Sequence, residues 1–193
     1  MNRVHLVPAS FVWPFLEFLQ DIGAPSGRFM ACAGIPEHAF ESQECLLPLH
    51  SLTRFAEFAS RAEGFHLGLE VGRRTSLHRF GDYGLAILSS STLKEALVTS
   101  ERYCRLYNPG LRLMVLAEGN NVILRHRYPR EFGEGYLQLE AYTLMIQINQ
   151  AQQWFGSNWL PPEVHVDPKL AHEIRRFENL AGCQIVETNG ATE

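Results

Sequence analysis

Residues 92–128 have the sequence TLKEALVTSERYCRLYNPGLRLMVLAEGNNVILRHRY, in which the hydrophobic period changes from helical to alternating. The first part spaces its apolar residues at i, i+3, i+4 and i+7, which predicts an amphipathic helix. Thr92 and Glu95 form a capping box at its start, because each side chain can accept a hydrogen bond from a free backbone N–H. Asn108-Pro109-Gly110 ends the helix.

Two alternating segments follow this turn and predict a β-hairpin. Apolar or aromatic positions alternate at Leu111, Leu113 and Val115 in the first segment, and at Val122, Leu124, His126 and Tyr128 in the second. Between them, Glu118-Gly119-Asn120-Asn121 supplies residues that tolerate the positive φ of a tight turn.

Helical patterns surround the hairpin on both sides in sequence. Helices or helical turns are expected over residues 10–22, 36–40, 51–63, 79–90, 134–155 and 167–180. Residues 24–34 are expected to be a connector, residues 65–71 a short apolar segment, and residues 164–166 and 183–186 strands. This order predicts an α+β fold, with several helices packed on a small, mostly antiparallel sheet that contains the central hairpin.

We expect residues 1–186 to form a single domain and the polar residues 187–193 to be a loose tail. A composition of 46% hydrophobic and 20% charged residues is that of a globular protein. The sequence contains neither a signal-peptide pattern nor an apolar run of about 20 residues, so a cytoplasmic protein is expected. Four scattered cysteines without a Cys-x-x-Cys pair favour free thiols, with a disulfide as the less favoured alternative.

The charge distribution argues against direct binding to nucleic acid. The net charge is −4, and residues 61–130 hold eleven basic against six acidic residues. These basic residues are scattered rather than contiguous, and fifteen of the seventeen in the chain are arginines, which favour fixed pairing with carboxylates. A DNA-binding module usually concentrates its basic residues on one face.

The sequence contains no catalytic or metal-binding signature. Its eight histidines form no His-x-x-x-His pair, and both the Gly-x-Ser-x-Gly elbow and the phosphate-binding loop are absent. We therefore expect no enzyme activity, no metal and no cofactor. A zinc site built from distant residues, such as Cys104 with His126, stays open as the less favoured alternative.

Polar residues on faces that should be buried indicate a small-molecule pocket between the hairpin and the helices. These faces carry, among others, the polar residues Tyr128, Tyr142 and Gln150. The candidate ligand-binding residues are Tyr103, Tyr107, His126, Gln147 and Trp154. The alternative is that each of them satisfies its own hydrogen bonds at the edge of the core.

Two motifs resemble a known family. They are GLEVG at residues 68–72 and FGDYGLAILSSSTLKEAL at residues 80–97. In their order they are similar to the N-terminal effector-binding domain, or arabinose-binding domain, of AraC-type transcriptional regulators, which carries a Gly-Leu-x-x-Gly turn, a Gly-x-x-Gly stretch ending in Thr-Leu-x-Glu-Ala-Leu, a tyrosine-bearing helix and a hairpin. Residues 159–164 and 177–185 fit its closing part, so the likeness spans about residues 10–186.

The resemblance implies a domain that senses a small effector or mediates dimerisation, while a C-terminal pair of helix-turn-helix units binds DNA. It implies a homodimer that contacts DNA only through that second domain, which we expect to be absent from this chain because nothing follows Glu193. It does not establish arabinose as the ligand. Two alternatives remain. One is a ligand-free dimerisation module that uses the apolar stripes of the helices starting at Thr92 and Glu134, and the other is an enzyme with a perturbed carboxylate or histidine in a cleft.

Overall fold

Helices dominate the computed structural model, which describes all residues except 1–3, 41–44, 65, 130–132, 189–191 and 193. The α+β class is confirmed. The α-helices are α1 (Trp13–Asp21), α2 (Ser26–Ala33), α3 (Leu49–Glu63), α4 (Leu67–Arg74), α5 (Gly81–Leu88), α6 (Leu93–Tyr107), α7 (Tyr136–Phe155) and α8 (Pro168–Ile174). The described residues also contain the 3₁₀ turns η1 (Ala9–Phe11), η2 (Glu37–Phe40), η3 (Leu77–Phe80) and η5 (Glu178–Leu180). The strands are β1 (Leu6–Pro8), β2 (Leu46–Pro48), β3 (Arg112–Glu118), β4 (Asn121–Arg127), β5 (Glu163–Val166) and β6 (Gln184–Glu187).

The described strands form three separate pairs rather than one sheet. β1–β2 and β3–β4 are antiparallel, and β5–β6 is parallel. The predicted hairpin is confirmed, with Glu118 opposite Asn121 across a turn in which Gly119 has a φ of +61°. The other two pairs have strands of only three or four residues, and neither joins the hairpin in a common sheet.

The predicted capping box at the start of α6 is confirmed, with its second half shifted by one residue. The hydroxyl of Thr92 accepts a hydrogen bond from the backbone N–H of Glu95 at 3.2 Å. The carboxylate of Glu95 accepts in return from the N–H of Ser91 at 2.9 Å. Two free donors at the helix N-terminus are thereby satisfied.

Helix α7 is the centre of the fold and packs closely on α4. A Cβ atom on Gly68 would lie 2.0 Å from the backbone oxygen of Gln138, and one on Gly72 would lie 2.7 Å from the Cβ of Met145. The backbone N–H of Gly68 also donates to the side-chain oxygen of Gln138 at 2.8 Å. The GLEVG motif is therefore a helix–helix contact and not the turn that the family resemblance implies, because its glycines provide close approach rather than a positive φ.

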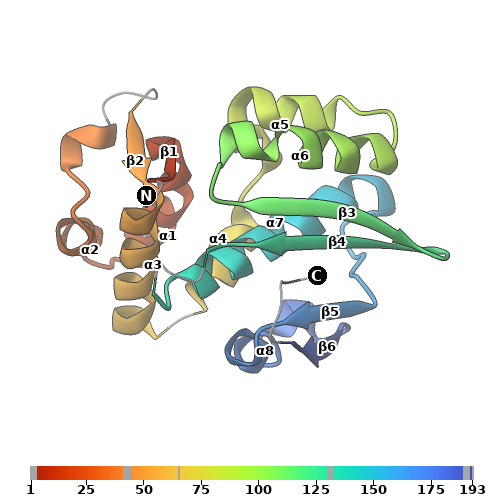
Figure 1. The fold of residues 1–193 in the computed structure, drawn as a ribbon. Helices are drawn as coiled ribbons and strands as arrows, with labels where there is room; N and C mark the ends of the chain where they lie inside the picture. The colour runs from red at the N-terminus through yellow and green to blue at the C-terminus, as the bar shows by residue number, and fades with distance from the viewer. Residues whose placement is uncertain (1–3, 41–44, 65, 130–132, 189–191, 193) are drawn as a thin grey trace.

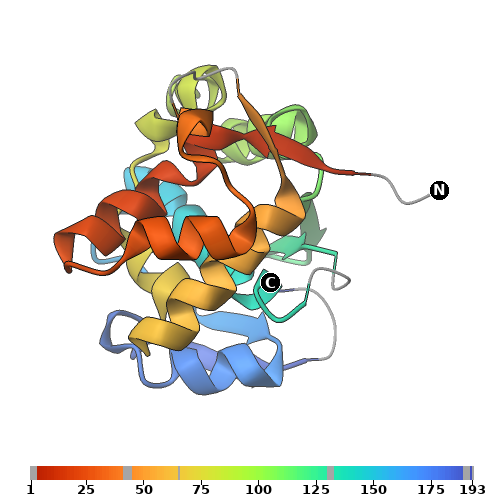
Figure 2. The same ribbon diagram turned by 90° about the vertical axis from the view of Figure 1, so that its left-hand side faces the viewer.

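Two hydrophobic cores lie on either side of this helix pair. The larger joins the N-terminal helices to α5, α6 and one face of α7, and it includes Phe15 and Phe55. The smaller joins the other face of α7 to β5 and α8, and it includes Leu144 and Val166. Figure 1 shows α7 behind the hairpin, with α5 and α6 on one side and α8 on the other, and Figure 2 shows α1 and α2 on the face nearest the viewer.

Two boundary predictions were wrong. Residues 24–34, expected as a connector, contain α2, which begins after Pro25, buries Phe29 and Ala33, and ends at Gly34 with a φ of +71°. The helix was not predicted because it has only eight residues and buries only these two side chains, which is too few to produce a helical pattern of apolar residues. The helix expected to reach residue 180 ends at Ile174, and η5 follows after a break.

The expectation of a loose tail fails at Thr192, which is buried. Its N–H donates to the carbonyl of His126 at 3.0 Å and its carbonyl accepts from the N–H of His126 at 2.8 Å. Its hydroxyl donates to the carboxylate of Glu140 on α7 at 3.1 Å. A single polar residue offers no apolar periodicity, so the sequence pattern gave no sign of this contact.

Candidate functional site

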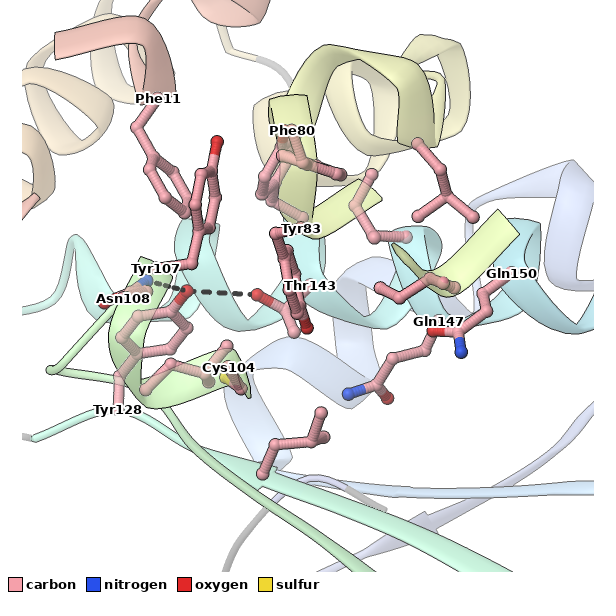
Figure 3. Close-up of a pocket in the computed structure, with 16 residues that line it drawn as sticks. Phe11, Phe80, Tyr83, Cys104, Tyr107, Asn108, Tyr128, Thr143, Gln147 and Gln150 are labelled. Atoms are coloured by element: carbon pink, nitrogen blue, oxygen red, sulfur yellow. Dashed lines mark hydrogen bonds between the residues drawn. The ribbon is translucent and has the colours of Figure 1, made fainter. Parts of the chain in front are cut away.

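A cavity of about 50 Å³ lies between α7, the α5–α6 pair and the beginning of the hairpin (Figure 3). Six aromatic side chains, five aliphatic ones, a thiol, a hydroxyl and three amides surround it. The lining residues are Phe11, Leu77, Phe80, Tyr83, Ile87, Cys104, Tyr107, Asn108, Leu111, Leu113, Tyr128, Tyr142, Thr143, Ile146, Gln147 and Gln150.

Four aromatic rings form a cluster along one wall of the cavity. Tyr107 is at its centre and stacks on Tyr83 with ring centroids 5.1 Å apart and planes inclined by 19°. The rings of Phe11 and Phe80 lie 4.9 and 5.7 Å from that of Tyr107. Such offset and tilted contacts are favourable for aromatic pairs, so the wall is held by rings that η1, η3, α5 and α6 each supply.

A second wall carries a hydrogen-bonded group of polar side chains. The hydroxyl of Tyr128 accepts from the Asn108 amide at 3.1 Å and lies 3.2 Å from the hydroxyl of Thr143, as the dashed lines in Figure 3 show. The other end of the Asn108 side chain accepts from the N–H of Gly110 at 3.1 Å. The turn that ends α6 thus positions Asn108 toward the cavity.

The far end of the cavity is also polar. The amide of Gln150 contacts the hydroxyl of Ser100, with Ser100 Oγ 2.9 Å from Nε2 and 3.1 Å from Oε1. The hydroxyl of Tyr83 donates to the carbonyl of Ser100 at 3.3 Å. These contacts join α5, α6 and α7 at one residue.

His126 lies directly behind the cavity, fully buried on β4. Its Nε2 is 3.1 Å from the carbonyl oxygen of Glu140, and its Nδ1 is 3.2 Å from the side-chain oxygen of Gln147. Burial lowers the pKa of His126 to about 4, so the ring is neutral at pH 7.

Burial keeps the titratable lining groups uncharged as well. It raises the pKa of the Tyr107 phenol and of the Cys104 thiol to about 12, and it raises the pKa of Tyr83, Tyr128 and Tyr142 further. Cys104 is therefore an inert thiol, because only the thiolate is a good nucleophile or metal ligand.

A comparison with known protein families matches residues 23–187 to the family described as the arabinose-binding domain of AraC transcription regulator, N-term. The chain belongs to this family. The match covers most of the sequence and agrees with the resemblance carried by residues 68–72 and 80–97. A search of curated proteins gives no match. The AraC-type family is one of ligand-sensing regulatory domains rather than of enzymes.

The structure brings three of the five candidate residues of this AraC-type domain together. Tyr107 and Gln147 line the cavity. His126 adjoins it through its contact with Gln147. Trp154 is half-buried against the larger core, one turn beyond Gln150, and is not among the lining residues.

Tyr103 lies outside the site, and its placement on the buried face was wrong. It is 38% exposed, and the guanidinium of Arg102 lies 5.4 Å from its ring centroid. Helix α6 lies at the surface and packs mainly on α5 and β3, so its buried face is narrow and centres on Ser100 and Cys104. Tyr103 falls at the edge of that face.

Several lining residues were not proposed as site residues from the sequence. Tyr83 lies in the stretch that carries the family resemblance, and Asn108 was interpreted only as part of a helix stop. Thr143 lies on α7, where nearly every residue is buried, so periodicity cannot distinguish cavity from core. Tyr128 and Gln150 are polar residues on faces predicted to be buried, and this pattern is the signal that could have identified them as lining residues.

The described residues contain neither a metal-binding cluster nor a helix that could span a membrane. No group of three or more His, Cys, Asp or Glu side chains among them is arranged to hold a metal ion. None of the helices described has both the length and the apolar character that crossing a bilayer requires.

Proposed function

We propose that this chain is the effector-sensing domain of an AraC-type transcription regulator, with a small molecule bound in the cavity lined by Tyr107 and Gln147. Binding would bias the population of dimer arrangements, which a linked helix-turn-helix domain reads as altered half-site spacing or affinity. The observation that carries this proposal is the cavity itself, since apolar walls with a few convergent polar groups are typical of small-molecule sites.

The position of the cavity supports a sensing role. Its walls come from η1, η3, α5, α6, β3 and α7, so a molecule inside it would contact six elements of the fold at once. A ligand can shift an equilibrium only through different contacts in the two states. A site shared by this many elements provides such contacts.

Native mass spectrometry of the protein as purified, followed by denaturation, tests the proposal. We expect a retained small mass, and we expect Cys104→Met to lose it because the longer side chain extends into the cavity. Gln153→Leu, on the exposed side of α7, serves as the matched control and should retain the mass. If the native protein carries no small molecule and a screen of small compounds leaves the melting temperature of the native chain and Cys104→Met equally unchanged, the proposal fails.

A ligand-free dimerisation module is the second candidate, favoured by an exposed apolar strip on α6. Val98 and Leu106 are 49% and 82% exposed and lie eight residues apart on one helix face, with Arg102 between them. This strip is not the surface expected from the sequence, because the apolar stripes of α6 and α7 are both largely buried within the chain.

Dilution distinguishes this candidate. We expect Leu106→Arg to weaken a dimer built on the α6 strip at least tenfold, since a charge at the centre of an apolar interface is left without a partner. Analytical ultracentrifugation of both proteins over a concentration series measures the change. The matched control, Leu85→Arg, alters another exposed leucine, 50% accessible, on α5. A dimer that Leu106→Arg leaves intact excludes the α6 strip as its interface.

A further inference from the structure

The cavity provides no charged partner for a ligand. None of its sixteen lining residues is an aspartate, glutamate, lysine, arginine or histidine. The four phenols and the thiol among them stay neutral because burial raises the pKa of every one of these groups. A carboxylate or ammonium group transferred from water into such a site loses its hydration without compensation.

Most of the polar groups around the cavity are already hydrogen-bonded to one another. Tyr128 is bonded to Asn108 and Thr143, and the amide of Gln150 is held by Ser100. A sugar presents a hydroxyl on nearly every carbon, and each needs a partner when it is buried. The lining has too few free groups for such a ligand, while its rings and aliphatic side chains suit an apolar body.

Gln147 and Tyr142 are the exceptions. Nε2 of the buried Gln147 amide has no hydrogen-bond partner among the described residues. Gln147 is only 9% exposed, and Figure 3 shows its side chain running from α7 toward the strand side of the cavity. The hydroxyl of Tyr142, which also lines the cavity, likewise lacks a partner in the described part of the chain. The Tyr142 hydroxyl lies close enough to Thr75 for that residue to lower the pKa of Tyr142, but the two side chains do not have the geometry of a hydrogen bond.

The contact with His126 determines which atom of Gln147 is free. The carbonyl of Glu140 can only accept, so Nε2 of His126 carries the proton and donates to it. The structure places the amide oxygen of Gln147 3.2 Å from Nδ1 and leaves the NH₂ without a partner. In that orientation two acceptors would face each other, because Nδ1 of the neutral ring accepts, so we assign the amide turned by 180°, with its NH₂ donating to Nδ1. The amide oxygen of Gln147 is therefore the atom without a partner, and it requires a donor.

We propose that the cavity binds an uncharged molecule with a mostly apolar, ring-sized body and one hydroxyl or N–H group that donates to the side-chain oxygen of Gln147. This inference rests on the proposed function and names the chemical class of the effector. It excludes carboxylates, amines and free sugars, including the sugar in the name of the family.

The cavity must widen to admit a ring. At about 50 Å³ it has room for roughly four water molecules, whereas an apolar cavity of about 150 Å³ is enough for benzene. Tyr83, Tyr107, Leu113 and Ile146 are only half-buried, so they form the part of the lining that can move with the least loss of packing.

Titration of the unmodified, ¹⁵N-labelled chain by NMR tests the ligand class with four probes. Phenol has the ring and the donor, anisole has the ring without the donor, benzoate has the ring with a charge, and L-arabinose has hydroxyls without the apolar body. We expect phenol to bind at least tenfold more tightly than each of the other three. Equal affinity for phenol and anisole, or tighter binding of benzoate or arabinose, would overturn the inference.

Two variants locate the binding. Gln147→Leu removes the acceptor and should weaken phenol about tenfold while leaving anisole unchanged, since one net hydrogen bond corresponds to about that factor. Cys104→Met should block every probe that enters the cavity, and Gln153→Leu should bind as the native chain does.

The outcomes separate this inference from the proposed function. Benzoate or arabinose bound in a Cys104→Met-sensitive manner would disprove the ligand class and leave the sensing role intact. If none of the four probes binds, the proposed ligand class is overturned. A mass retained in native spectrometry and lost in Cys104→Met would then still support the sensing role, and its absence would remove both.

Discussion

His126 links three separate parts of the chain at the scale of a single residue. Its ring contacts Glu140 and Gln147 on α7, and its backbone pairs with Thr192. Because Gln147 lines the cavity, the histidine lies between the site and the C-terminal segment. The neutral ring is required for this arrangement, since Nδ1 must accept a hydrogen bond.

Acid should therefore weaken the fold through His126. The pKa of this histidine is about 4 in the folded chain and 6.5 in the ordinary, solvated state. Between these values the unfolded chain binds a proton that the folded chain does not, so the free energy of unfolding is highest above pH 6.5 and falls as the pH drops toward 4. The loss amounts to about 3 kcal/mol at roughly 1.36 kcal/mol for each pKa unit.

Urea unfolding of the native chain and of His126→Gln between pH 4 and pH 7.5 measures this contribution. The variant should be less stable at pH 7 but should depend less steeply on pH, whereas the exposed His78→Gln should keep the native slope. Glu140 also lies beside the ring, so the comparison between variants, rather than the native profile alone, identifies the histidine. An unchanged slope in His126→Gln would contradict the assignment.

At the scale of elements, the contact between α4 and α7 depends on two glycines. Gly68→Ala would place a Cβ 2.0 Å from a backbone oxygen of α7, which a side-chain rotation cannot relieve. We expect a loss of about 3 kcal/mol of stability from the enforced separation of the helices. Gly27→Ala in α2 is the matched control, since a Cβ there meets nothing within 4 Å, and it should stabilise by about 0.5–1 kcal/mol. Thermal unfolding followed by circular dichroism measures both variants. If Gly68→Ala were as stable as the native chain, the two helices would not be in close contact.

The sequence predicts the elements that have a strong local cause. The hairpin has its alternation and Gly119, α6 has Thr92 and Glu95, and α8 has Asp167, whose side chain accepts from the N–H of Lys169 at 3.0 Å. It does not predict how the elements meet. The role of Gly68 in a helix contact, like the pairing of Thr192 with β4, depends on partners far away in the chain.

At the scale of the whole molecule, the cavity is a product of assembly rather than of any one motif. It takes residues from η1 to α7, and the distance in sequence between Phe11 and Gln150 leaves no local pattern to recognise. Face arguments found Tyr107 and Gln147 because each lies on a buried helical surface. They failed for Tyr103 because the width of a buried face is set by what packs against the helix.

The close contact at Gly68 and Gly72 makes the molecule mechanically asymmetric around the cavity. One side of α7 is in close backbone contact with α4, and another side of α7 forms one wall of the cavity. Expansion for a guest must therefore displace the opposite wall, which α5 and α6 provide. The outer surface of α6 carries Val98 and Leu106, so a displacement of α6 would also move the exposed strip that we propose as the alternative dimer contact.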